Sequence, residues 1–198
     1  MMQTTDYLND LAASVQQMTD RVEELTRLYT HTQLRQRPEP ARWSVLDNLE
    51  HLSLYGDFYL PTFDKAIQKG LQHGWAPRAT FRAGWLGGFF VRSMRPRGNR
   101  IPNPMKTFKD KNPILTAVPE HAAERFVKQQ HELLEILNRA RQTDIRRLRI
   151  GTTLGPFPRI SLGDGLAFII GHQERHFLQI ERTLVETGVT LQAQLRWG

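Results

Sequence analysis

The stretch S-L-G-D-G-L-A-F-I-I-G-H-Q-E-R-H-F-L-Q-I, residues Ser161–Ile180, decides the fold of this chain. Its apolar residues recur every three or four positions, a pattern typical of an amphipathic helix with one buried face. Ser161 and Asp164 have the spacing of a capping box, in which each side chain satisfies a free amide of the first turn. The stretch therefore predicts a long helix that begins at Ser161 and carries His172 and His176 on its inner face.

Three further segments show the same helical periodicity. Their apolar residues recur over residues 8–28, 46–67 and 126–140. The second segment starts at another capping box, Ser44 and Asp47, and a proline suits the start of the third near Pro119. No segment of useful length alternates polar and apolar residues, so we expect no sheet. The sequence predicts an all-α fold, a four-helix bundle that forms a single domain over residues 1–198.

A long crossover, residues 71–118, joins the second and third of these helices. It is rich in glycine, proline, arginine and aromatic residues. A structureless loop of this length is uncommon in a compact domain, so we expect a short extra helix over residues 85–94. The aromatic side chains need a surface to pack against, and a flap that closes one end of the bundle is the role we favour. The alternatives are a substrate lid, a dimer contact and a membrane-binding patch.

The chain is basic, with a formal net charge of +7 in 198 residues. The excess lies in two connections: residues 78–119 hold nine basic residues and one acid, and residues 139–159 hold six and one. No recognised nucleic-acid-binding motif accompanies them, so we expect no nucleic acid partner. The pattern predicts either solvated basic loops or a basic rim around a site for anionic substrates.

The absence of cysteine excludes disulfide bonds, cysteine-ligated zinc or iron–sulfur sites and a cysteine nucleophile. No apolar run approaches the roughly 18 residues of a membrane-spanning helix. The N-terminal residues do not have the pattern of a signal peptide. We therefore expect a cytoplasmic protein with no transmembrane segment.

Seven histidines are present, and two of them form the pattern G-H-Q-E-R-H at residues 171–176. Residues four apart on a helix lie about 40° apart around its axis and about 6 Å apart at Cβ, so His172 and His176 can chelate one metal ion. Ordinary hydrogen bonds would satisfy the same imidazoles. Glu174 points about 160° away from the pair, toward the outer face, so the H-E-x-x-H arrangement of metalloproteases is excluded.

His51 is the third candidate ligand, because it follows the start of its helix by about two turns and lies near the edge of the apolar stripe. With His172 and His176 it would complete a three-nitrogen site between facing helices. Such a set leaves a coordination position open, which is typical of a catalytic metal site. The remaining histidines show no partnering pattern, and we expect them at the surface or in loops: His31, His73, His121 and His131.

Three polar residues are candidates to orient the histidines from behind. Asp47 and Asn48 precede His51 by about one turn, and Gln179 follows His176 by three residues. Helix capping is the role that we favour for Asp47. No residue stands out as a general base, so the sequence leaves the catalytic residues unassigned.

Two motifs resemble signatures of the DinB/YfiT-like superfamily. They are R-W-S-V-L-D-N-L-E-H-L, Arg42–Leu52, and G-P-F-P-R-I-S-L-G-D-G-L-A-F-I-I-G-H-Q-E-R-H-F-L-Q-I, Gly155–Ile180. The short motif M-K-T-F, Met105–Phe108, is similar to the larger DinB-like branch. The resemblance follows helix order and covers nearly the whole chain.

The resemblance implies a four-helix bundle with a long crossover between its second and third helices. It also implies a divalent metal ion, zinc or nickel before iron, cobalt or manganese, held by His51, His172 and His176. It further implies a homodimer and a small-molecule substrate, with hydrolysis or transfer to a low-molecular-weight thiol as the reaction. The alternative is a non-catalytic binding module whose basic aromatic insert, residues 75–111, contacts a partner or a membrane surface.

Overall fold

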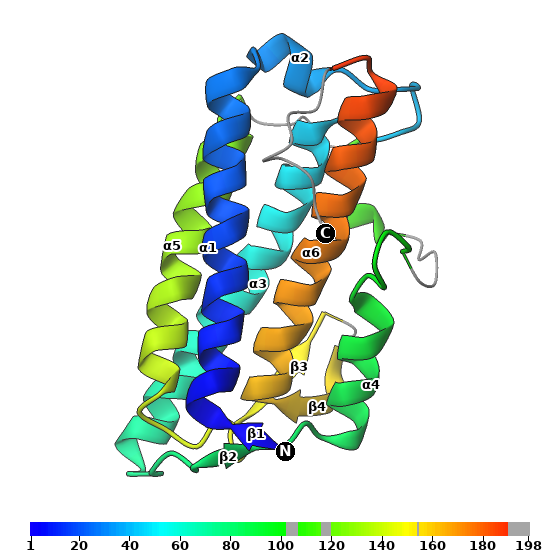
Figure 1. Ribbon diagram of the computed structural model, residues 1–198. Helices are drawn as coiled ribbons and strands as arrows, with labels where there is room; N and C mark the ends of the chain where they lie inside the picture. Colours follow the sequence, from blue (N-terminus) through cyan, green and yellow to red (C-terminus); the bar gives the residue numbers. More distant parts are fainter. Residues whose placement is uncertain (102–106, 116–119, 154, 190–198) are drawn as a thin grey trace.

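The structure is a computed structural model that describes residues 1–101, 107–115, 120–153 and 155–189 (Figure 1). The chain is mostly helical, as the sequence predicts. Its helices are α1 (Thr4–Leu28), α2 (His31–Arg35), α3 (Val45–Gln72), α4 (Trp85–Met94), the short 3-10 helix η1 (Lys109–Lys111), α5 (Ala122–Ala140) and α6 (Leu162–Glu186). Its strands are β1 (Met2–Gln3), β2 (Thr80–Phe81), β3 (Arg149–Thr152) and β4 (Gly155–Ser161).

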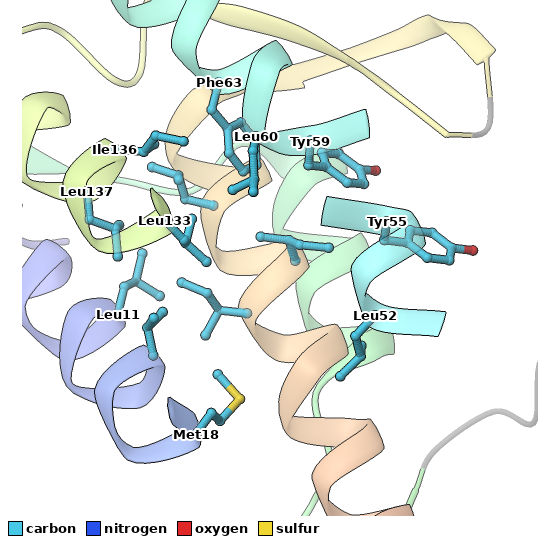
Figure 2. Packing of buried hydrophobic residues seen from close by; sticks show 14 of the residues in the cluster. Leu11, Met18, Leu52, Tyr55, Tyr59, Leu60, Phe63, Leu133, Ile136 and Leu137 are labelled. Carbon is cyan, nitrogen blue, oxygen red and sulfur yellow. The ribbon is translucent and has the colours of Figure 1, made fainter. Parts of the chain in front are cut away.

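The four long helices α1, α3, α5 and α6 lie side by side, and α1 and α3 each contact both α5 and α6 (Figure 1). Their apolar stripes meet in one buried cluster (Figure 2). It includes Met18 from α1, Phe63 from α3 and Leu133 from α5, each at most 1% exposed. Burial of each such side chain contributes about 1.5–3 kcal/mol to folding, so this cluster fixes the positions of the helices that carry the histidines.

The start of α3 has the predicted capping box. Ser44 Oγ accepts a hydrogen bond from the Asp47 amide at 3.0 Å, and the Asp47 carboxylate accepts one from the Ser44 amide at 2.8 Å. Ser161 likewise caps α6, accepting from the Asp164 amide at 3.1 Å, but the reciprocal half of that box is absent. The Asp164 carboxylate instead accepts from Ser161 Oγ and from the amide of Gly84, so it ties the start of α4 to the start of α6.

The prediction that the chain has no sheet is wrong, because two short antiparallel pairs form: β1 with β2 and β3 with β4. Met2 pairs with Phe81, and Ile150 pairs with Ile160. A two-residue strand is too short to show alternation, and β1 and β2 lie far apart in the sequence. The prolines of β4 also obscure its pattern, since proline is uncommon within strands.

The segment between α3 and α5 includes β2, α4 and η1, and α4 packs against α6. Gly87 allows this close approach, because a Cβ at that position would lie 2.4 Å from Cγ of Asp164. Phe81 is buried in the core, whereas Trp85 remains 86% exposed. The segment therefore packs on the helices in part and leaves an aromatic side chain in solvent.

Two of the sequence predictions fall partly outside the described residues. Residues 105 and 106 of the M-K-T-F motif lie outside them, and so does the predicted helix start near Pro119. Within the described chain, α5 begins at Ala122. The described helices include none that is both long and apolar enough to cross a membrane.

Candidate metal centre

Three histidines meet at one buried point between α3 and α6. His51 comes from the second turn of α3, and His172 and His176 lie one turn apart on α6. The Nε2 atom of His172 lies 3.3 Å from Nε2 of His51 and 3.1 Å from Nε2 of His176. Two nitrogens bound tetrahedrally to one zinc ion at about 2.0–2.1 Å would lie about 3.3 Å apart. The spacing of these nitrogens therefore suits a shared metal ion.

The opposite ring nitrogens of two of these histidines are held by oxygen atoms. His51 Nδ1 lies 2.7 Å from the backbone carbonyl oxygen of Lys111, and His176 Nδ1 lies 2.9 Å from Oδ1 of Asn48. The Asn48 amide nitrogen donates to the Ser44 carbonyl at 2.8 Å, which fixes Oδ1 as the atom facing His176. An oxygen acceptor places the proton on Nδ1, so Nε2 of both imidazoles presents a lone pair to the cluster.

The cluster has more lone pairs than its own hydrogens can satisfy. His172 can offer at most one Nε2 hydrogen, whereas both His51 and His176 present acceptors to it. The other ring nitrogen of His172, Nδ1, is buried and has no hydrogen-bond partner among the described residues. A cation bound by the three Nε2 atoms would satisfy the lone pairs that meet between them.

Burial keeps the three imidazoles neutral, which is the form that binds a metal. It lowers the pKa of His51 from 6.5 to about 4. Burial also lowers the pKa of His172 and of His176 well below the ordinary value, and the positive charge of Arg175 adds to the effect on both. Protonation is therefore a poor way for this cluster to satisfy its lone pairs.

The three residues predicted to orient the ligands have different surroundings. Asn48 holds His176, as described above. Asp47 instead accepts two hydrogen bonds from Arg37, at 2.7 and 2.8 Å, and one from Ser44 at the helix start. Gln179 lines the cavity, but its side-chain oxygen is buried and has no hydrogen-bond partner among the described residues.

A cavity of about 610 Å³ opens onto the three histidines. Residues of α4 form one wall, among them Phe89, Phe90 and Met94, so the segment between α3 and α5 contributes directly to the cavity. Tyr55 lies one turn after His51, with its ring centroid 4.6 Å from that of His172. Burial raises the pKa of Tyr55 to about 12, so its phenol keeps its proton and can donate a hydrogen bond.

Three arginines line the cavity that the sequence did not single out: Arg42, Arg175 and Arg182. They lie outside the two basic connections, residues 78–119 and 139–159. Arg175 follows His172 by three residues, a spacing that puts both on neighbouring positions of one helix face and could have identified it. Glu174 lies outside the described lining of the cavity, as predicted, but not on an outer face: its side chain is only 14% exposed, and one of its oxygens lies 3.3 Å from Nε of Arg95.

The remaining histidines are all exposed, as the sequence predicts. They are His31, His73, His121 and His131. The fold and the site place this chain in the class of helical proteins in which three neutral imidazoles meet at one buried cavity, an arrangement suited to a divalent metal.

The family model of the DinB superfamily matches residues 14–180, and the chain belongs to this superfamily. The matched region includes His51, His172 and His176. No curated protein and no solved structure matches the chain.

Proposed function

We propose that this protein is a metal-dependent enzyme in which His51, His172 and His176 hold one divalent ion. The observation that carries the proposal is the convergence of three buried Nε2 atoms, two of them fixed by oxygen acceptors on Nδ1. The three imidazoles fit zinc or nickel best, with iron, cobalt or manganese as alternatives. A bound ion would supply Lewis acidity next to a cavity large enough for a small molecule.

The protein's own residues give this site its shape and electrostatics. Asn48 and the Lys111 carbonyl hold the histidines in the metal-binding tautomer. Tyr55 offers a protonated phenol to a bound molecule. The described lining of the cavity includes no carboxylate that could act as a general base. We propose hydrolysis or transfer to a low-molecular-weight thiol as the reaction.

The finer features implied by the family resemblance belong to the same proposal. They are a single DinB-type four-helix-bundle domain with a crossover helix, a homodimer and a cytoplasmic location. The packing of α1, α3, α5 and α6 supports the bundle, and the contact of α4 with α6 supports the crossover helix.

Enzyme assays on chelator-treated and metal-loaded protein test the proposal. We would reconstitute the protein with zinc or nickel and assay ester, amide and phosphoester cleavage, and thiol addition to electrophiles. Turnover should require metal, disappear in His51→Ala and persist in His131→Ala, which changes an exposed histidine of another part of the surface. Turnover that survives in His51→Ala would contradict the proposal.

A non-catalytic binding module is the second candidate, because Trp85 of α4 is 86% exposed and Phe157 of β4 is 79% exposed. The two elements contact each other, and exposed arginines lie nearby in the sequence. This function predicts binding to vesicles that contain anionic lipid, with loss of binding in Trp85→Ala. Vesicle binding without any metal-dependent turnover would favour it over the enzyme.

A further inference from the structure

The charged side chains that line the histidine cavity are of one sign. The described lining includes Arg42, Arg175 and Arg182 and no aspartate or glutamate. Arg175 is the deepest of the three, only 6% exposed, whereas Arg42 and Arg182 are exposed at the mouth. The cavity thus has a cationic group at its base and two more at its opening.

The contacts of the two outer arginines differ. Arg42 forms an ion pair with Glu186, with 2.5 Å between its Nη2 and a carboxylate oxygen. Arg182 donates to the neutral backbone carbonyl of Asn99, a contact that does not compensate its charge. Arg182 therefore adds positive potential to the mouth.

Arg175 is the first source of positive charge at the base of the cavity, because it is close enough to His172 and His176 for its charge to lower the pKa of both. A bound metal ion would be the second source. A divalent ion held only by neutral imidazoles would keep its full charge, and the low dielectric of a buried site strengthens its attraction for an anion. This second source of potential rests on the proposed function, whereas the arginines do not.

The walls of the cavity are apolar. Aromatic rings from five parts of the chain line it: Trp43, Tyr55, Phe89 with Phe90, Phe108 and Phe168. Phe90 and Phe168 pack against each other, with their ring centroids 6.4 Å apart. A volume of about 610 Å³ lies within the range of cavities that enclose small organic ligands. The cavity is thus built for a ligand with an apolar body and a charged end.

We propose that the cavity binds a small organic anion, with its acidic group toward Arg175 and the histidines and its apolar body against the aromatic walls. A planar guanidinium matches the geometry of a carboxylate or sulfonate, to which it can donate two parallel hydrogen bonds. Neutral molecules of the same shape would lack this interaction. The arginines therefore select the charge of the substrate, and the rings select its body.

A pair of fluorescent probes tests this preference. Anilinonaphthalene sulfonate is an aromatic anion, and phenylnaphthylamine has the same rings without the acid. We expect the wild-type protein, metal-loaded or chelator-treated, to bind the anion at least about tenfold more tightly than the neutral amine. Equal affinities for the two probes would overturn the proposal.

Variants locate the preference in the cavity. Arg175→Gln should reduce the preference for the anion by about tenfold and Arg182→Gln by about threefold, while affinity for the amine stays within about twofold. Arg159→Gln, which changes an exposed arginine outside the described lining, should leave the preference unchanged. If Arg175→Gln fails to fold, Arg182→Gln decides. A preference that survives in the folded arginine variants of the cavity overturns the proposal.

Metal content measured on the same samples separates this inference from the proposed function. Protein that binds metal but does not prefer the anion contradicts this inference alone. Protein that prefers the anion but binds no metal contradicts the proposed metal site alone.

Discussion

Two cavities in this protein are each lined by three histidines. The first, of about 610 Å³, lies among α3, α4 and α6 and includes His51, His172 and His176. The second, of about 490 Å³, lies where α1, α2 and α5 meet and includes His31, His121 and His131. The histidines of the first are buried, and those of the second are exposed.

The charges around the two cavities also differ. Arginines line the first cavity, whereas Glu23, Glu120 and Glu124 line the second together with Lys128. In the second, His121 Nδ1 lies 3.1 Å from a carboxylate oxygen of Glu124, and both side chains are exposed.

Only the first set converges. In the part of the chain that the structure describes, it is the one group of three or more histidine or carboxylate side chains with ligand atoms all within 4.8 Å of one another. Burial and fixed tautomers, rather than the number of histidines, thus distinguish a candidate metal centre from a polar surface cavity.

The largest expected effect is stabilisation by metal at the first cavity. Free metal at about a thousand times its dissociation constant should raise the free energy of unfolding by about 4 kcal/mol, because it binds only the folded chain. Thermal unfolding with and without zinc checks this. The increase should vanish in His172→Ala and remain in His131→Ala. An equal increase in both variants would contradict metal binding at the first cavity.

Acid should destabilise the metal-free protein through the first cavity. The pKa of His51 is 6.5 in the unfolded chain and about 4 in the folded one, so the unfolded chain binds a proton first. The stability contributed by His51 is complete above about pH 6.5 and decreases by about 3 kcal/mol as the pH falls to 4.

Urea unfolding at several pH values measures this loss. His51→Gln should flatten the dependence between pH 6.5 and 4 relative to the wild type. His31→Gln, in the second cavity, is the matched control. An unchanged slope in His51→Gln would contradict the assignment of this loss to burial of the imidazole.

Removal of the acceptor behind His176 should weaken metal binding without abolishing it. Asn48→Ala takes away the oxygen that holds Nδ1, and loss of such a partner reduces metal affinity about 10–100-fold. Competition with a chromogenic chelator measures the change. Asp47→Ala is the control: it should lower stability, because Asp47 caps α3 and binds Arg37, but change metal affinity by less than about threefold.

The smallest expected effect lies in the second cavity. His121→Ala removes an exposed contact between Nδ1 and the Glu124 carboxylate, and exposed pairs of this kind contribute at most about 1 kcal/mol even when both groups are charged. Chemical unfolding should therefore place this variant within about 1 kcal/mol of the wild type, with unchanged metal content. A larger loss would mean that the second cavity has a structural role beyond a solvated surface.

Local patterns in the sequence account for the long helices. The periodic apolar residues and the Ser44 cap lie within a few residues of one another, so their geometry follows from the helix repeat. The pair of β1 and β2 is different, because Met2 pairs with Phe81, 79 residues further along the chain. The sequence predicts that Asp164 completes a local cap. Its carboxylate instead accepts a hydrogen bond from the amide of Gly84, eighty residues earlier in the chain.

The candidate centre shows the same division. The spacing of His172 and His176 on one helix and the place of His51 near an apolar stripe could be derived from sequence, and the family resemblance implied that the three act together. The Lys111 carbonyl that holds His51 could not be anticipated, since a backbone oxygen leaves no mark on composition. The lining arginines were also missed, because the count of charges pointed to the basic connections and not to single arginines next to the histidines.

Elemental analysis of the purified protein tests the central claim most directly. We would measure transition metals in wild type, His172→Ala and His131→Ala after reconstitution and removal of excess ion. About one metal ion per chain in wild type and His131→Ala, and none in His172→Ala, is the result that the buried cluster predicts. No metal in the wild type, or the same content in all three proteins, would contradict a metal centre at His51, His172 and His176.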